Sequence, residues 1–199
     1  GTYSVNDLND KVRRVLRLTF RTVMNRNRPF GALNSDEHSE ACRTIGEEGI
    51  VLLQNRGNVL PVDLTKTHRI AVIGENAIKM MTVGGGSSSL KVRYEVTPLD
   101  GLKNRIGGKA EIVYARGYVG DPTGEYNGVV TGQDLSDSRS PEELRAEALD
   151  VARNADIVLF FGGLNKSNHQ DCEDTDRESL DLPYGQSDLI EAIAKVNPN

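Results

Sequence analysis

Six carboxylate side chains and one arginine follow a short apolar run near the end of this sequence. The run, Ile157 to Phe161, ends in two glycines, and Arg177 lies among the carboxylates. Carboxyl groups gathered in one loop can bind a hard cation or transfer protons, and functional loops are typically held at the end of a rigid strand. Residues 155–183 are therefore the first candidate site. The six carboxylates are Asp171, Glu173, Asp174, Asp176, Glu178 and Asp181.

A metal site is the first interpretation to test. The spacing that begins at Asp171 lacks the glycine at the sixth position and the glutamate at the twelfth position of an EF-hand calcium loop. His169 is the one histidine nearby, which is too few for a zinc site. We therefore expect no metal and no cofactor here.

Two other interpretations of the acidic loop stay open on the residues alone. A glycosidic leaving oxygen needs a proton from a carboxylic acid whose pKa is raised by burial or by neighbouring carboxylates. This loop groups several carboxylates around one arginine, so it can supply such an acid. Alternatively, the charges are simply solvated, and Asp176 pairs with Arg177 to shape the loop.

A second candidate loop follows the apolar run Arg69 to Gly74. It contains three glycines and three serines, residues 84–89, but no Gly-Lys-Ser or Gly-Lys-Thr follows, and the spacing is not that of a dinucleotide site. Glycine serves equally for close approach of the backbone to a ligand and for a flexible surface loop. If a ligand approaches, the candidate substrate-binding residues are Gly85, Gly86, Ser87 and Ser88.

Helical and apolar segments alternate along the chain. The strands are apolar on both sides, which is typical of a parallel sheet with helices on both faces, a three-layer α/β/α sandwich. In such sheets ligands bind at the carboxyl ends of the strands, so both candidate loops are expected to project from one edge. We expect strands at 50–53, 69–74, 110–115 and 157–161, helices at 7–24, 35–48, 99–105, 140–154 and 186–196, and an irregular stretch at 121–138.

Composition limits the class of protein. The 199 residues are 37% hydrophobic and 27% charged, with a formal net charge of -5, which argues against a nucleic-acid surface. No apolar run approaches the roughly 20 residues of a membrane span. We expect residues 1–34 to be the closing helix of a preceding domain plus a linker, and residues 35–199 to be an α/β domain that is incomplete at its C-terminal end.

The acidic loop also resembles a known family. Asp171 to Arg177, Ser179 to Pro183 and Gln186 are similar to the E-x-E-G-x-D-R-x-x-L-x-L-P-x-x-Q stretch in the second domain of glycoside hydrolase family 3. Asp171 stands where glutamate is usual, and Asp174 replaces the usual glycine. Further stretches match in the same order along the chain: Glu47 to Asn55, Ile70 to Ala77, Gly84 to Ser88, and Thr97 to Leu102.

The resemblance implies a retaining β-glycosidase, of β-glucosidase or β-xylosidase type, that removes terminal β-linked sugars from a carbohydrate substrate. In that family a preceding (β/α)8 barrel carries an aspartate nucleophile, and the α/β sandwich supplies the acid/base glutamate. The matching position here is Glu173, with Asp171 as the runner-up. We expect the fragment alone to be inactive and the parent to be periplasmic or extracellular.

A second hypothesis is a non-catalytic carbohydrate-binding or interaction domain that keeps the fold without the chemistry, since fold alone does not establish function.

Overall fold

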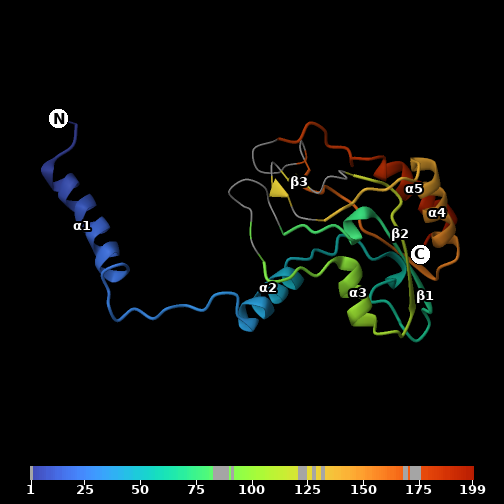
Figure 1. The fold of residues 1–199 in the computed structure, drawn as a ribbon, viewed down its shortest axis with the longest axis horizontal. Coiled ribbons are helices and arrows are strands. Elements are labelled where there is room, and N and C mark those ends of the chain that lie inside the picture. Colours follow the sequence, from blue (N-terminus) through green and yellow to red (C-terminus); the bar gives the residue numbers. More distant parts are fainter. Residues whose placement is uncertain are drawn as a thin grey trace. The chain divides into compact units, whose positions relative to one another are not determined.

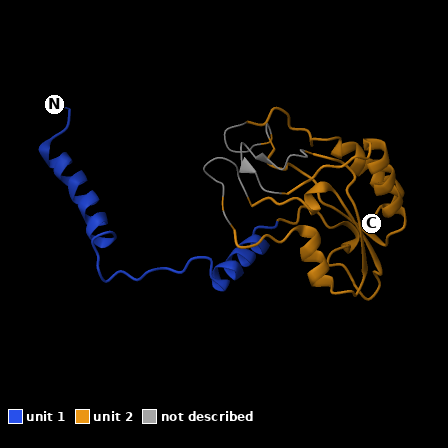
Figure 2. Cartoon of the chain, in the orientation of Figure 1, with its two compact units in different colours: residues 1–50 blue, residues 51–199 orange. Residues whose placement is uncertain are grey.

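The computed structural model describes residues 2–82, 90, 92–120, 125–126, 129–130, 133–167, 170 and 176–199. The chain divides into two compact units, Gly1–Ile50 and Val51–Asn199 (Figure 2). The sequence predicts a different division, between residues 34 and 35, and that remains a prediction about the domains of the longer protein.

The first unit consists of two helices. Helix α1, Val5–Arg21, begins with a capping box in which Ser4 and Asp7 bond each other's backbone N–H groups. Helix α2, Asp36–Glu48, begins at Ser35, whose hydroxyl accepts from the N–H of His38. Both helices lie wholly within the described residues, and none of their residues is buried.

The second unit is built on a parallel sheet of three strands, which are β1 (Arg69–Ile73), β2 (Glu111–Ala115) and β5 (Ile157–Phe160). Their order is β2-β1-β5, and Ile70 of the central strand pairs with Ile112 on one side and Ile157 on the other. Strands β1 and β2 are labelled in Figure 1. Strand β1 is buried along almost its whole length because sheet neighbours and helices surround it.

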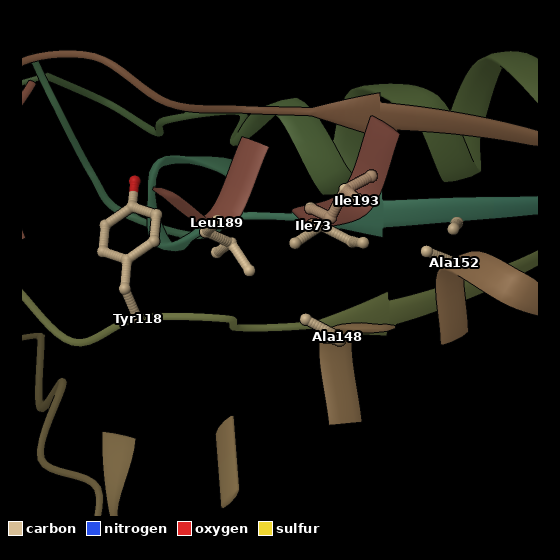
Figure 3. Packing of buried hydrophobic residues seen from close by; sticks show 8 residues of the cluster. Ile73, Tyr118, Ala148, Ala152, Leu189 and Ile193 are labelled. Atoms are coloured by element: carbon tan, nitrogen blue, oxygen red, sulfur yellow. The ribbon is translucent and has the colours of Figure 1, made fainter. Parts of the chain in front are cut away.

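Helices cover both faces of this sheet. Helices α4 (Pro141–Arg153) and α5 (Gln186–Val196) pack on one face, where Ala148 and Leu189 meet Ile73 of β1 (Figure 3). Helix α3, Pro98–Ile106, covers the other face through Leu99 and Ile106. The predicted three-layer α/β sandwich is confirmed.

The shorter elements complete the unit. They are the 3₁₀ turns η1 (Arg56–Asn58) and η2 (Glu75–Ala77), and the antiparallel strands β3 (Glu125–Tyr126) and β4 (Val129–Val130). The β3–β4 pair falls within the stretch 121–138 that we expected to be irregular. No helix in the described part of the chain combines the length and apolar character needed to cross a membrane.

One predicted strand is wrong. Residues 50–53 form no strand, and their side chains are exposed, with Leu53 at 92%. A four-residue apolar run satisfies the composition of a buried strand, but a strand also needs a neighbouring edge to accept its backbone hydrogen bonds. Strand β5 is half-buried instead of buried on both faces, because within the described sheet it is an edge strand.

Candidate functional site

The three parallel strands end together, so the residues that follow them form one carboxyl edge. Gly74 follows β1 and has a φ of 117°. A Cβ atom at this position would lie 2.1 Å from the carbonyl oxygen of Phe161, which follows β5. The two chains can approach this closely only because residue 74 is glycine.

A buried ionic cluster lies directly beyond Gly74. Glu75, Lys79 and Arg116 are 0%, 1% and 5% exposed. The Oε2 atom of Glu75 accepts from Nη2 of Arg116 at 2.8 Å and from the N–H of Gly120 at 2.6 Å. The Nζ atom of Lys79 lies 4.0 Å from Oε1 of the same carboxylate. Because the charged groups of this cluster are buried away from water, their geometry is tightly held. The cluster therefore fixes the segment after β2 against the segment after β1.

The cluster continues to the surface as a chain of ion pairs. Arg116 Nη1 lies 3.4 Å from Asp137 Oδ2, which in turn lies 2.7 Å from Arg139 Nη2. Hydrogen bonds from the Arg139 side chain, and then from its backbone N–H, hold the pKa of Asp137 far below its usual range. The last link joins Arg139 to Glu147 of α4 at 2.6 Å. The segment between β2 and α4 is thereby attached at both ends.

Polar side chains also fix the segment after β5. The side-chain amide of Gln186, the first residue of α5, accepts from the N–H of Gly163 at 2.7 Å and donates to its carbonyl at 3.0 Å. The Nδ2 atom of Asn76 donates to the carbonyl of Leu164 at 3.2 Å. Asn165, which follows, is fully buried. The chain that leads to the acidic loop therefore leaves the sheet in a defined direction.

Two tyrosines lie at the same edge, the half-buried Tyr114 and the buried Tyr118. The hydroxyl of Tyr114 donates to the carbonyl of Gly74 at 3.3 Å, and that of Tyr118 donates to the carbonyl of Phe161 at 3.4 Å. Burial raises the pKa of both hydroxyls. Both therefore remain neutral donors at any physiological pH.

The predicted catalytic and substrate-binding residues lie outside the described part of the chain. These are Asp171, Glu173, Gly85, Gly86, Ser87 and Ser88. What the structure describes is the chain on either side of them. Their roles remain predictions.

The flanks of the two candidate loops are in direct contact. The Nζ atom of Lys166, shortly before the acidic loop, donates to the carbonyl of Met81, shortly before the glycine-serine loop, at 2.6 Å. The N–H groups of Met81 and Thr82 both donate to the Glu95 carboxylate, beyond the glycine-serine loop. The two segments that lead into the candidate loops thus meet at one edge.

The far flank of the acidic loop is organised by Arg177. Its guanidinium donates to the carbonyl oxygens of Ser179 and Leu180, the latter at 2.8 Å. Asp176 and Arg177 are both described, and no ion pair joins them, so the expected pairing is not formed. The guanidinium finds acceptors in the backbone that curves around it. Arg177 remains a candidate for shaping this part of the loop, by a different contact.

A cavity of about 310 Å³ adjoins this flank. Its lining combines three apolar residues with polar and charged ones, which are Gln170, Arg177, Glu178, Ser179, Asp181 and Tyr184. Among the residues that the structure describes, no group of three or more His, Cys, Asp or Glu side chains is arranged to hold a metal ion. The described edge therefore offers hydrogen-bond donors and acceptors beside an open space.

Comparison with known proteins identifies the family. The family model of the glycosyl hydrolase family 3 C-terminal domain matches residues 50–199. The chain therefore belongs to glycosyl hydrolase family 3, and the resemblance predicted from its motifs is confirmed.

The most similar curated proteins include a β-glucosidase. The chain is 46% identical over 205 residues to β-glucosidase BoGH3A of Bacteroides ovatus, an alignment that covers 100% of this chain and 26% of that protein. It is 37% identical over 169 residues to a β-xylosidase of Formosa agariphila, covering 81% of this chain and 20% of that protein. The chain thus spans about a quarter or less of the length of these relatives.

Solved structures agree with this assignment. The crystal structure of the Bifidobacterium adolescentis GH3 β-glucosidase matches with a TM-score of 0.72 at 29% identity, over 100% of this chain and 26% of that one. A β-glucosidase from Kluyveromyces marxianus, solved in complex with glucose, matches with a TM-score of 0.74 at 19% identity, over 98% of this chain and 40% of that one. The latter likeness is one of fold.

Sequence reasoning missed several residues that build this edge. Glu75, Lys79 and Arg116 carry no local motif that marks them as partners, because Glu75 and Arg116 are 41 positions apart. Their one signal is the Gly-Glu-Asn that ends the apolar run of β1. Gln170 and Tyr184 likewise gave no signal beyond their nearness to the acidic loop.

Proposed function

We propose that this chain is the acid/base-supplying part of a retaining β-glycosidase that removes terminal β-linked glucose or xylose from glycosides or oligosaccharides. Family membership and the names of the relatives support the class of reaction. The observation that carries the proposal is the contact of Lys166 with Met81, which joins the flanks of the acidic and glycine-serine loops at the carboxyl edge. That edge is where parallel α/β sheets bind ligands.

The proposed acid is Glu173. In a retaining mechanism the protonated carboxyl group gives its proton to the leaving glycosidic oxygen as a nucleophilic carboxylate attacks the sugar. The same group, now a carboxylate, removes a proton from the water that hydrolyses the glycosyl-enzyme. The nucleophile is assigned to an aspartate of a preceding (β/α)8 barrel in the longer protein, with the two carboxyl groups roughly 5 Å apart.

Two further parts of the proposal follow because its two catalytic carboxylates lie in different domains. The fragment supplies one carboxylate of two, so the isolated chain is expected to hydrolyse no aryl β-glycoside. We place the enzyme in the periplasm or outside the cell. This location is supported by a 31% identical relative from Salmonella typhimurium, which is named a periplasmic β-glucosidase and aligns over 97% of this chain and 27% of that protein.

The test uses the chain joined to its barrel and compares two leaving groups. Glu173→Ala should lower kcat/KM for a methyl β-glycoside by about 10²-fold or more, because an alkoxide cannot leave without a proton. The loss should be far smaller for a 2,4-dinitrophenyl β-glycoside, whose leaving group needs no proton. Azide should then restore turnover and yield a glycosyl azide, since it attacks the glycosyl-enzyme without a general base.

Two variants complete the experiment. Glu142→Ala alters an exposed carboxylate on α4 and should leave both substrates unaffected. Asp171→Ala tests the runner-up. If Asp171→Ala shows the leaving-group dependence and azide rescue while Glu173→Ala does not, the acid is Asp171. Unchanged kinetics in both variants would contradict the proposed role of this loop.

A further inference from the structure

The side chain of Gln170 joins the two ends of the acidic loop. Gln170 comes immediately before Asp171 and is 9% exposed. Its Oε1 atom accepts from the backbone N–H of Asn165 at 3.0 Å, and its Nε2 atom donates to the hydroxyl of Tyr184 at 2.6 Å. Tyr184 comes just after the loop, so one amide group connects the chain before residues 171–183 with the chain after them.

The near end of this connection is itself fixed. The Oδ1 atom of Asn165 accepts from the N–H of Ser167 at 3.1 Å, and the N–H of Gln170 donates to the carbonyl of Ser167 at 3.1 Å. Asn165 is fully buried and Ser167 nearly so. Because side chain and backbone close the same turn, the amide of Gln170 has little freedom to move.

The far end is fixed by aromatic packing. The ring of Tyr184 stacks on that of buried Tyr118, with centroids 6.2 Å apart and an interplanar angle of 12°. Tyr184 has a φ of 61°, a left-handed conformation in which the chain turns sharply into Gly185 and α5. The Tyr184 hydroxyl therefore occupies a position set by the ring beneath it.

We propose that Gln170 and Tyr184 are positioning residues for the acid/base loop of the glycosidase, an inference that rests on the proposed function. Holding both ends of residues 171–183 by one short hydrogen bond reduces the conformations open to the segment between them. Neither side chain is assigned a proton-transfer role. Their effect is to place the acid, and misplacement of a catalytic group by about 1 Å can cost about 10²-fold in rate.

The bridge needs an acceptor and a donor on the same short side chain. Glutamine supplies both, because its Oε1 faces an N–H group and its Nε2 faces a hydroxyl oxygen. Glutamate can replace it in part, since its two oxygens can accept from the Asn165 N–H and from the Tyr184 hydroxyl, which can also act as a donor. Alanine supplies neither contact.

The experiment measures how kcat/KM depends on the leaving group in the chain joined to its barrel, using a series of aryl and alkyl β-glycosides. Gln170→Ala and Tyr184→Phe should each lower kcat/KM for the methyl glycoside by about 10-fold to 10²-fold, with little change for the 2,4-dinitrophenyl glycoside. The plot of log kcat/KM against leaving-group pKa should become steeper. Gln170→Glu should recover part of the loss.

Tyr3→Phe is the matched control, because it removes the hydroxyl of an 84% exposed tyrosine that takes no part in the bridge. Tyr184→Phe keeps the stacked ring, so it tests the hydrogen bond even if Gln170→Ala fails to fold. If Glu173→Ala shows the leaving-group signature while Tyr184→Phe and Gln170→Glu keep the wild-type slope and rate, the positioning role is refuted. If neither Glu173→Ala nor Asp171→Ala shows the signature, the proposed function itself fails.

Discussion

Replacing Glu75 by glutamine tests whether the ionic cluster holds the carboxyl edge together. The substitution keeps the shape of the side chain but removes its charge, and it leaves the buried Arg116 with the more distant Asp137 as its remaining carboxylate partner, at 3.4 Å. Breaking a buried ion pair by removing one partner costs about 3–5 kcal/mol. Because Asp137 compensates in part, we expect the lower end of that range.

This expected loss in the free energy of unfolding is a large fraction of the net stability of a domain, about 5–15 kcal/mol. Urea unfolding of the 199-residue chain should show it as a fall in the midpoint of about 1–2 M, for a slope of about 2 kcal/mol per M. Far-UV circular dichroism is the suitable probe, since the chain contains no tryptophan.

The control is Glu191→Gln on α5, where the carboxylate is exposed and lies 4.0 Å from Lys195. This change should alter stability by less than about 1 kcal/mol. The double variant Glu75→Leu with Arg116→Met should be less destabilised than Glu75→Leu alone, because the buried guanidinium that loses its main partner is then removed as well. Equal effects of Glu75→Gln and Glu191→Gln, or strict additivity in the double variant, would refute the reasoning.

Two further predictions concern single residues. The Asp156 carboxylate accepts from the N–H groups of His68 and Arg69, and these hydrogen bonds lower its pKa below the ordinary value of 3.8. Asp156→Asn should therefore lower the melting temperature at pH 7. The difference from the wild type should shrink as the pH falls below about 4, because the carboxylate is then increasingly protonated. Gly120→Ala should destabilise by about 1–3 kcal/mol, because its Cβ would lie 2.5 Å from a buried carboxylate oxygen, whereas Gly46→Ala, with open space in α2, should stabilise by up to about 1 kcal/mol.

Thermal melts across a pH series check the Asp156 prediction, and a deficit that is the same at pH 3 and pH 7 would contradict it. Urea unfolding checks the glycine pair. There the contradictory result is a loss of stability at Gly46 or a gain at Gly120.

The sequence predicts the layered fold well because its cues are local. Strand β1 was expected at 69–74 and lies at Arg69–Ile73, and the final helix was expected at 186–196, the bounds of α5. The capping box at Ser140 and Glu143 marks the start of α4 through contacts within four residues. Periodicity and caps of this kind need no knowledge of the rest of the chain.

The errors occur where the outcome depends on distant partners. Residues 50–53 have the composition of a strand, but no described strand pairs with them. The β3–β4 pair was missed because strands of two residues carry no period. The bridge between Gln170 and Tyr184 spans 14 positions, and its donor and acceptor are ordinary polar residues. The local sequence pattern therefore predicts which loops are candidates for the site. The contacts that hold the chain on either side of these loops are visible only in the structure.

The order of the sheet has a consequence for how the chain folds. The central strand β1 comes first in the sequence, and its neighbour β5 joins the sheet only through pairings such as Ile70 with Ile157, about 87 positions apart. Contacts between such distant segments slow folding, because closing the long intervening segment costs conformational entropy before the contacts form. During synthesis, β1 therefore emerges well before β5 and must wait with one apolar edge open. That interval is when this unit is most exposed to aggregation and when assistance from chaperones would matter most.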